Sequence, residues 1–268
     1  MIDLGFVLCE ECTSWPTCAP LHRTVHKRPE DTAFPNARNK QSFTLNGGCG
    51  THLDAPSHFV PHGRTVEQIG PSELTNVPLA IIDCSSASDG DGDYMMGMAA
   101  IVADEAANGR IPTGALVCVR TGWAAARYSD RDQYYNATDA SDVDPSLGLA
   151  RMHFPGVSAE AATFLVRERG CVGLGIDTLS PDGGGGASAG FPTHHAVLGA
   201  DRYILENLRL AGDVPPRGAR ANVAPLNVRG APEAPARVFA VLGGDHGATP
   251  TRETQTAIAN MLMNAMLA

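Results

Sequence analysis

Four stretches of consecutive apolar residues have the length of buried β-strands. They cover residues 79–84, 115–120, 171–176 and 237–242, and a further apolar run in residues 1–9 predicts a strand at the start of the chain. Runs this short, separated by segments of helical character, favour strands that alternate with helices. The pattern therefore predicts an α/β fold that is rich in β-structure.

The segment that follows residue 157 has the pattern of an amphipathic helix. Ser158 is a suitable N-cap and Glu160 lies in the expected first turn. The apolar stripe consists of Ala161, Phe164 and Leu165. Gly170 is expected to end the helix.

A second helix is predicted at the end of the sequence. Residues 253–268 carry apolar side chains at helical spacing, namely Ile258, Met261, Leu262 and Met266. Packing in the core or between subunits explains this stripe better than contact with a cofactor does.

A glycine-rich stretch predicts a mobile loop. Residues 182–190 contain four consecutive glycines. No Lys-Ser or Lys-Thr pair follows them, so a phosphate-binding P-loop is not indicated. Two roles stay open for this loop, a lid beside an active site and a plain linker.

Length and charge narrow the class of protein. The chain has 268 residues and a net charge of −9, and no low-complexity linker divides it, so we expect one domain over residues 1–268. The acidic balance argues against nucleic acid as a partner, because phosphate contacts need clustered Lys and Arg. No apolar run has the length of a membrane span, and the first residues do not resemble a signal peptide. We therefore expect a cytoplasmic protein.

The seven cysteines suit reduced thiols in that compartment. They are odd in number and lie at positions 9, 12, 18, 49, 84, 118 and 171, which does not suggest a disulfide framework. Cys9, Cys12, Cys18 and His22 have spacings that can hold a small structural zinc ion. Ordinary core or loop cysteines are the alternative that we favour.

A short segment near residue 50 holds the densest group of potential metal-binding and catalytic side chains in the chain. Three of the nine histidines, His52, His58 and His62, lie there together with Asp54. Alternate side chains of an extended segment share one face, so His52 and Asp54 can bind one cation. Pro56 ends the strand and places the other two histidines on the loop that follows. Histidines that cap a strand end are the alternative, but such clusters more often mark metal or catalytic sites.

This segment resembles the signature of a known family. Residues 50–58 match the pattern Gly-Thr-His-x-Asp-x-Pro-x-His of the cyclase family, metal-dependent amide hydrolases that include bacterial kynurenine formamidase and isatin hydrolase. Similarity to the second half of the family lies in residues 153–156, 175–182, 193–201 and 205–208. The resemblance covers about residues 3–245. It implies a single β-rich α/β domain of the swivelling β/β/α type, assembled into a homodimer or larger oligomer.

The resemblance also implies a metal site. The family carries a metal-binding His and Glu twelve residues apart, which correspond here to His194 and Glu206, and these would join His52 and Asp54. His195 is adjacent to His194, but the alignment of Leu198 and Gly199 with the family pattern selects His194. A surface carboxylate is the alternative for Glu206, although the apolar residues before it favour burial, and a buried Glu needs a cation or a proton. Imidazole and carboxylate ligands suit Mn²⁺ or Zn²⁺.

The chain departs from the family at position 48. The family places a His four residues before His52, and Gly48 stands there in this chain, so one ligand is missing. A single ion held by the remaining ligands, in place of a two-metal site, fits the residues present. Asn46 and Cys49 are nearby side chains that could substitute.

The chemistry implied is hydrolysis of a small carbonyl compound by activated water. His58 occupies the catalytic position of the family, and His62 is either a second acid/base or a group that binds substrate carbonyl oxygens. No Gly-x-Ser-x-Gly elbow is present, which disfavours a serine hydrolase. Aromatic residues that flank the motif can form a wall for the substrate or pack in the core: Trp15, Phe34, Phe43 and Phe59.

The predicted substrate is a small cyclic amide such as isatin, or an aromatic amide. Gly48 together with residues 177–182 favours isatin-hydrolase-like members of the family over formamidases. Hydrolysis of N-formylkynurenine or of a lactone is the alternative activity. A metal-binding or ligand-binding protein without catalysis is the alternative of a different class, but such a protein would have no use for a base at His58.

Overall fold

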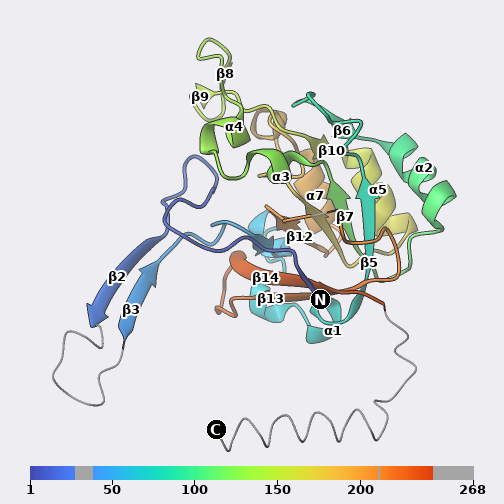
Figure 1. The fold of residues 1–268 in the computed structure, drawn as a ribbon, viewed down its shortest axis with the longest axis horizontal. Coiled ribbons are helices and arrows are strands. Elements are labelled where there is room, and N and C mark those ends of the chain that lie inside the picture. Colours follow the sequence, from blue (N-terminus) through green and yellow to red (C-terminus); the bar gives the residue numbers. More distant parts are fainter. Residues whose placement is uncertain (28–38, 211, 244–268) are drawn as a thin grey trace, which may run out of the picture.

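A computed structural model of the protein describes residues 1–27, 39–210 and 212–243 (Figure 1). The predicted helix over residues 253–268 and the aromatic residue Phe34 lie outside the described residues. None of the described helices is long and apolar enough to cross a membrane.

The main sheet closes on itself. Its strands are β1 (Ile2–Asp3), β4 (His52–Asp54), β5 (Val77–Asp83), β7 (Leu116–Arg120), β11 (Gly173–Ile176), β12 (Tyr203–Glu206), β13 (Arg220–Pro225) and β14 (Glu233–Val241). Among the described residues, seven strands form a ring in the order β14-β13-β5-β7-β11-β12-β4, because β4 pairs back with β14, and β1 adds to β14. The neighbours from β5 to β12 are parallel, and the other pairs are antiparallel.

Helices and short strand pairs surround this ring (Figure 1). The helices are α1 (Pro71–Leu74), α2 (Met98–Asn108), α3 (Trp123–Arg127), α4 (Arg131–Tyr135), α5 (Ala159–Glu168), α6 (Gly186–Ala189) and α7 (Pro192–Leu198), with 3₁₀ turns η2 (Pro56–His58) and η3 (Val66–Gln68). The small pairs are β2 (His22–Lys27) with β3 (Lys40–Thr44), β6 (Met95–Met96) with β10 (Gly156–Val157), and β8 (Val143–Asp144) with β9 (Leu149–Ala150). The β2–β3 hairpin projects away from the body of the molecule.

Alternating side chains on the ring divide the core into two apolar layers. On β5, Leu79 and Ile81 belong to the layer inside the ring, whereas Ala80 and Ile82 pack with α2, α5 and α7 outside it. Such alternation is the consequence of the two-residue period of a strand. Packing inside the closed sheet is tight at β11, where a Cβ on Gly173 would overlap the aromatic side chain of a buried tyrosine. The predicted β-rich α/β class is therefore confirmed.

The predicted elements appear with shifted ends. The four apolar runs form β5, β7, β11 and the later part of β14. Helix α5 begins directly after Ser158, whose hydroxyl accepts a hydrogen bond from the backbone N–H of Ala161 at 3.2 Å. Gly170 follows the helix with a φ of 63°, a left-handed conformation that glycine adopts without strain.

The predicted strand over residues 1–9 is wrong beyond Asp3. The backbone N–H of Leu4 still bonds to a carbonyl of β14, but Phe6 donates instead to the side chain of Thr51, at 2.9 Å. Val7 is 85 % exposed. Apolar residues alone therefore did not make this segment a strand, because its backbone bonds to groups outside the sheet.

The predicted loop over residues 182–190 is wrong in part. Residues 182–184 are buried, and the second half of the segment includes α6. A Cβ on Gly184 would overlap the carbonyl group of Met152, and one on Gly186 would overlap the side chain of Asp182. The glycines allow close packing of backbone here, which the sequence pattern does not distinguish from flexibility.

The cysteines near the start of the chain do not converge on a zinc site. Cys12 is buried with its Sγ 3.6 Å from Sγ of Cys49, whereas Cys9 is exposed. Among the described residues, the groups that can hold a metal ion include no cysteine. The structure therefore places Cys12 and Cys49 in a small buried cluster.

Candidate metal centre

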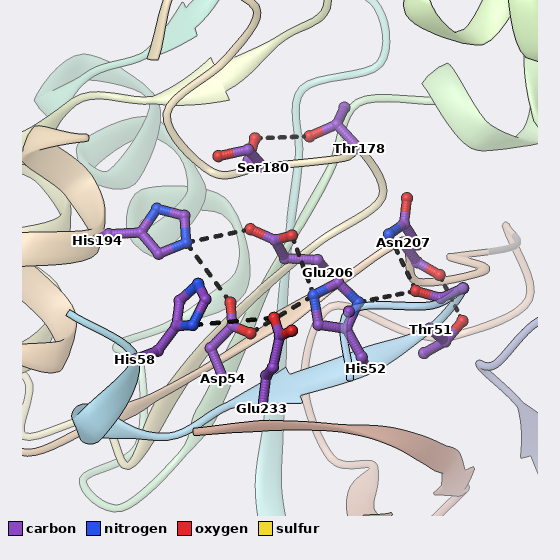
Figure 2. A network of polar contacts seen from close by, with 12 residues as sticks. Thr51, His52, Asp54, His58, Thr178, Ser180, His194, Glu206, Asn207 and Glu233 are labelled. Atoms are coloured by element: carbon purple, nitrogen blue, oxygen red, sulfur yellow. Dashed lines mark hydrogen bonds and ion pairs between the residues drawn. The ribbon is translucent and has the colours of Figure 1, made fainter. Parts of the chain in front are cut away.

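Three adjacent strands present polar side chains on one face (Figure 2). Strand β4 lies between β12 and β14, with His52 opposite Glu206 and Asp54 opposite Glu233. Leu53, between the two ligands on β4, belongs to the apolar layer inside the ring. The four polar side chains consequently lie on the outer face of the ring, as the alternation of His52 and Asp54 in the sequence predicts.

Two histidines from outside the ring complete the cluster. His194 lies on α7 and is 4 % exposed, and His58 ends the turn η2 with a side chain that is 30 % exposed. Their rings are 6.1 Å apart between centroids. Five of these six side chains line a cavity of about 200 Å³, and the sixth, Asp54, is 1 % exposed.

Two overlapping groups within the cluster can hold a metal ion, one of His52, Asp54 and Glu206 and one of Asp54, His58 and His194, each with ligand atoms within 4.8 Å of one another. His52 Nε2 lies 3.5 Å from Asp54 Oδ1 and 3.3 Å from Glu206 Oε2, and His194 Nε2 lies 3.5 Å and 3.3 Å from the other oxygens of the same two carboxylates. Ligands about 2.1 Å from a tetrahedral ion are separated by about 3.4 Å. Both oxygens of Asp54 and one of Glu206 are buried without a hydrogen bond from the described residues. Carboxylate oxygens buried in this way need a positive charge beside them, which a metal ion or a protonated imidazole supplies.

The second nitrogen of each histidine fixes the orientation of its ring. Nδ1 of His52 lies 2.8 Å from the carbonyl oxygen of Gly50, and Nδ1 of His194 lies 2.5 Å from Oδ2 of Asp182. Gly50 has a φ of 63°, which only glycine adopts readily, and this turn aims its carbonyl at the ring. With Nδ1–H donating in both cases, each Nε2 is free to bind a metal ion.

Without a metal ion, the histidines and carboxylates of the cluster stabilise one another's charged forms. Burial lowers the pKa of His52, but Asp54 and Glu206 outweigh it and raise this pKa to about 10. The pKa of His194 is raised well above its ordinary value against the effect of burial, by Asp182, Asp54 and Glu206. Against burial, His52 and His194 hold the pKa of Asp54 at about 2. The metal-free site therefore holds protons on its imidazoles, which a metal ion must displace.

The structure brings four predicted ligands together and separates other candidates from them. His195 is exposed on α7. His62 is exposed in a turn with a φ of 64° and does not line the cavity. Glu206 is 6 % exposed, so a surface carboxylate is excluded. Two roles were predicted for His62, a second acid/base and a group that binds substrate carbonyl oxygens. Neither therefore has geometric support.

Part of the predicted aromatic wall is present. Trp15 and Phe59 line the cavity, whereas Phe43 is 54 % exposed on the projecting β3. Phe191, which the sequence did not single out, joins the two, with ring centroids 5.9 Å from Trp15 and 5.2 Å from Phe59. Phe59 also lies 4.6 Å from the ring of His194. The aromatic side chains therefore border the candidate metal ligands directly.

Sequence reasoning missed two carboxylates of the site. Asp182 lies in the glycine-rich stretch that we predicted to be a loop, and Glu233 lies next to prolines. The signal for Asp182 was its place in a motif shared with the cyclase family. Glu233 carried no such signal.

Comparison with known proteins decides the family. The Cyclase family model, described as "Putative cyclase", matches residues 2–183. The chain belongs to the cyclase family. The matched residues include the first pair of ligands on β4, whereas His194, Glu206 and Glu233 follow them in the sequence.

Curated relatives in the cyclase family include two hydrolases. The isatin hydrolase of Roseibium aggregatum is 30 % identical over 207 residues, which are 75 % of this chain and 73 % of that protein. The kynurenine formamidase of Maricaulis maris is 30 % identical over 233 residues, 83 % of this chain and 95 % of that protein.

Solved structures of similar proteins extend the match over nearly the whole chain. Isatin hydrolase A from Ralstonia solanacearum has a TM-score of 0.78 at 29 % identity and covers 90 % of this chain and 91 % of its own. Isatin hydrolase A from Labrenzia aggregata, bound to benzyl benzoate, has a TM-score of 0.76 at 27 % identity and covers 91 % and 93 %. The predicted membership of the family is confirmed.

Proposed function

We propose that the protein is a metal-dependent hydrolase that opens a small cyclic amide or cleaves an aromatic amide. The observation that carries this proposal is the set of buried carboxylate oxygens of Asp54 and Glu206 that face Nε2 of both His52 and His194 without hydrogen-bond partners. The similar proteins named isatin hydrolase and kynurenine formamidase support the same class of reaction.

The ion would be Mn²⁺ or Zn²⁺, held by His52, Asp54, His194 and Glu206. Imidazole nitrogens and carboxylate oxygens are ligands of both metals. A divalent ion bound there supplies Lewis acidity, which lowers the pKa of water toward neutrality and polarises a substrate carbonyl group.

His58 is the group that moves protons in this proposal. Its ring borders the cavity, and the distance of 3.8 Å between its Nδ1 and Oε2 of Glu233 supports an orientation toward the ligands. His58 takes a proton from the attacking water and returns it to the leaving nitrogen when the C–N bond breaks. The water oxygen forms the new C–O bond as the C–N bond breaks, which leaves a carboxylate and an amine, both on one molecule when the amide is cyclic.

The walls of the cavity support a flat substrate. Trp15, Phe59 and Phe191 form one aromatic side, and aromatic rings pack well against each other in edge-on and offset arrangements. Ser180 also lines the cavity, and its hydroxyl oxygen accepts a hydrogen bond from the backbone N–H of Asp182, which leaves its O–H to donate to a substrate oxygen. A compact ring with adjacent carbonyl groups, such as isatin, suits this combination.

The test is a substrate screen with controlled metal content. The protein is stripped with a chelator, reloaded with Mn²⁺ or Zn²⁺, and assayed with isatin, N-formylkynurenine and small lactones. We expect metal-dependent opening of isatin, with no rate for His52→Ala. Binding of metal without turnover of any substrate would contradict the proposal and favour a non-catalytic binding protein.

We also propose a cytoplasmic homodimer or larger homo-oligomer. Seven free cysteines support a reducing compartment. The projecting β2–β3 hairpin exposes Val25 and Phe43, at 39 % and 54 %, as expected of side chains covered by another subunit. Light scattering during gel filtration tests this assembly, and a monomeric mass would contradict it.

A further inference from the structure

The carboxylate of Glu233 lies next to the point from which a side chain at position 48 would extend. A Cβ on Gly48 would lie 3.0 Å from Oε2 of Glu233 and 3.5 Å from Nε2 of His52, so a side chain at position 48 would enter the site. A Cβ on Gly47 would overlap Cγ of Glu233. The two glycines therefore leave room for a carboxylate that comes from another strand.

The position of Glu233 in the sheet is unfavourable without a cation. It lies directly opposite Asp54 on the neighbouring strand, and directly opposed like charges destabilise a sheet. Asp54 is 1 % exposed and has no hydrogen bond to either oxygen, and the Glu233 side chain is only 20 % exposed. Within the described part of the chain, the carboxylate of Glu233 forms one ion pair, with His58 at 3.8 Å, and no hydrogen bond.

The other side chains near position 48 already have partners. Sγ of Cys49 is turned toward Cys12, and the side chain of Cys49 is fully buried. Oδ1 of Asn46 accepts a hydrogen bond from the backbone of Gly48 at 3.1 Å. Figure 2 shows Glu233 beside Asp54 and His52, with its carboxylate turned into the cluster.

We propose that Glu233 is a metal ligand that replaces the histidine absent at Gly48. It completes a site on three adjacent strands, with His52 and Asp54 from β4, Glu206 from β12 and Glu233 from β14. A carboxylate oxygen binds Mn²⁺ and Zn²⁺ as an imidazole nitrogen does, but adds a negative charge. The inference rests on the proposed function only in that the cavity binds a divalent ion.

The experiment measures metal binding and needs no substrate. Chelator-treated variants are titrated with MnCl₂ and ZnCl₂ by calorimetry, and circular dichroism verifies the fold of each. We expect Glu233→Ala to lower the affinity by at least about tenfold, the scale seen even for groups that only support a ligand. Glu233→Gln, which keeps the size of the side chain, is expected to lose affinity in the same direction. Glu160→Gln on the surface of α5 is the matched control and should bind like the original protein.

The decisive variant restores the histidine of the family. In Glu233→Ala combined with Gly48→His, the imidazole enters the vacated space, and the affinity should return to within about threefold of the original. Unchanged affinity in both Glu233 variants, or a loss that the double variant does not restore, would overturn the inference. His52→Ala separates this result from the proposed function, because normal binding in that variant would contradict the metal site as a whole.

Discussion

Asp182 contacts His194 twice. Its Oδ2 lies 2.5 Å from Nδ1 of the ring and 3.2 Å from the backbone nitrogen, and Oδ1 accepts a hydrogen bond from the backbone of Thr193 at 2.6 Å. The same carboxylate therefore binds the first turn of α7 and turns the imidazole of His194 toward the ligands on the sheet.

Replacing that carboxylate tests its support of the ligand. We expect Asp182→Asn to keep the fold but to lower metal affinity by about 10- to 100-fold, because the neutral amide no longer holds the Nδ1 proton by a charge-assisted bond. Calorimetric titration measures the change. Affinity equal to that of the original protein would mean that the contact serves only the helix.

Removal of a ligand on β4 is expected to remove the metal. His52→Ala and Asp54→Ala each delete a buried group of the cluster, so both should lose bound metal on dialysis and lose hydrolysis. Elemental analysis after dialysis measures the metal content. Full content and rate in either variant would show that the ion binds elsewhere.

Glu206→Gln tests the charge of the ligand on β12. The amide keeps an oxygen in place but removes the negative charge, so metal affinity should fall while the fold survives. Titration with metal and thermal unfolding are measured on the same sample. An unchanged affinity would assign Glu206 a role in packing alone.

His58→Ala separates proton transfer from metal binding. If His58 is the base, the variant keeps its metal and loses turnover by about 10²- to 10⁴-fold. Metal content and kcat are measured together. The structure also groups His58 with Asp54 and His194 as three side chains whose ligand atoms lie within 4.8 Å of one another, so loss of metal would identify His58 as a ligand.

The stability of the metal-free protein should fall at alkaline pH. The pKa of His52 is raised from its ordinary value of 6.5 to about 10, against the effect of burial, by Asp54 and Glu206. Its contribution to folding is complete below pH 6.5 and is lost as pH rises through 10. Metal binding displaces this proton, so the loaded protein should lack the decline, and its metal affinity should rise with pH. Melting temperatures from pH 6 to 10 test this, and parallel curves with and without metal would contradict it.

Rules that depend only on neighbouring residues were sufficient to predict some parts of the site. Alternation in a strand places His52 and Asp54 on one face, and Pro56 begins the turn that carries His58. His194 and Glu206, by contrast, depended on resemblance to the family, because their approach to β4 requires the closed ring. No periodicity within a segment encodes that closure.

Prolines and glycines account for the parts that the sequence did not predict. Pro232 and Pro235 flank Glu233 and indicate a break in a strand, yet β14 begins at Glu233 and pairs Pro235 with His52. The glycines after Asp182 indicate a flexible loop, but here they allow backbone segments to touch. In both places the meaning of the residue depends on contacts with distant segments.

Because β4 pairs back with β14, a metal ion bound at the candidate centre would link distant parts of the chain. An ion bound by residues 52 and 206 would join segments about 150 residues apart and would stabilise the folded chain, because the unfolded chain contains no such site. The ion would bind where early and late parts of the chain meet, since β4, β12 and β14 all carry side chains of the cluster. Metal release would therefore first weaken the pairing of β4 with β12 and β14, while the parallel strands β5, β7 and β11 keep their pairing.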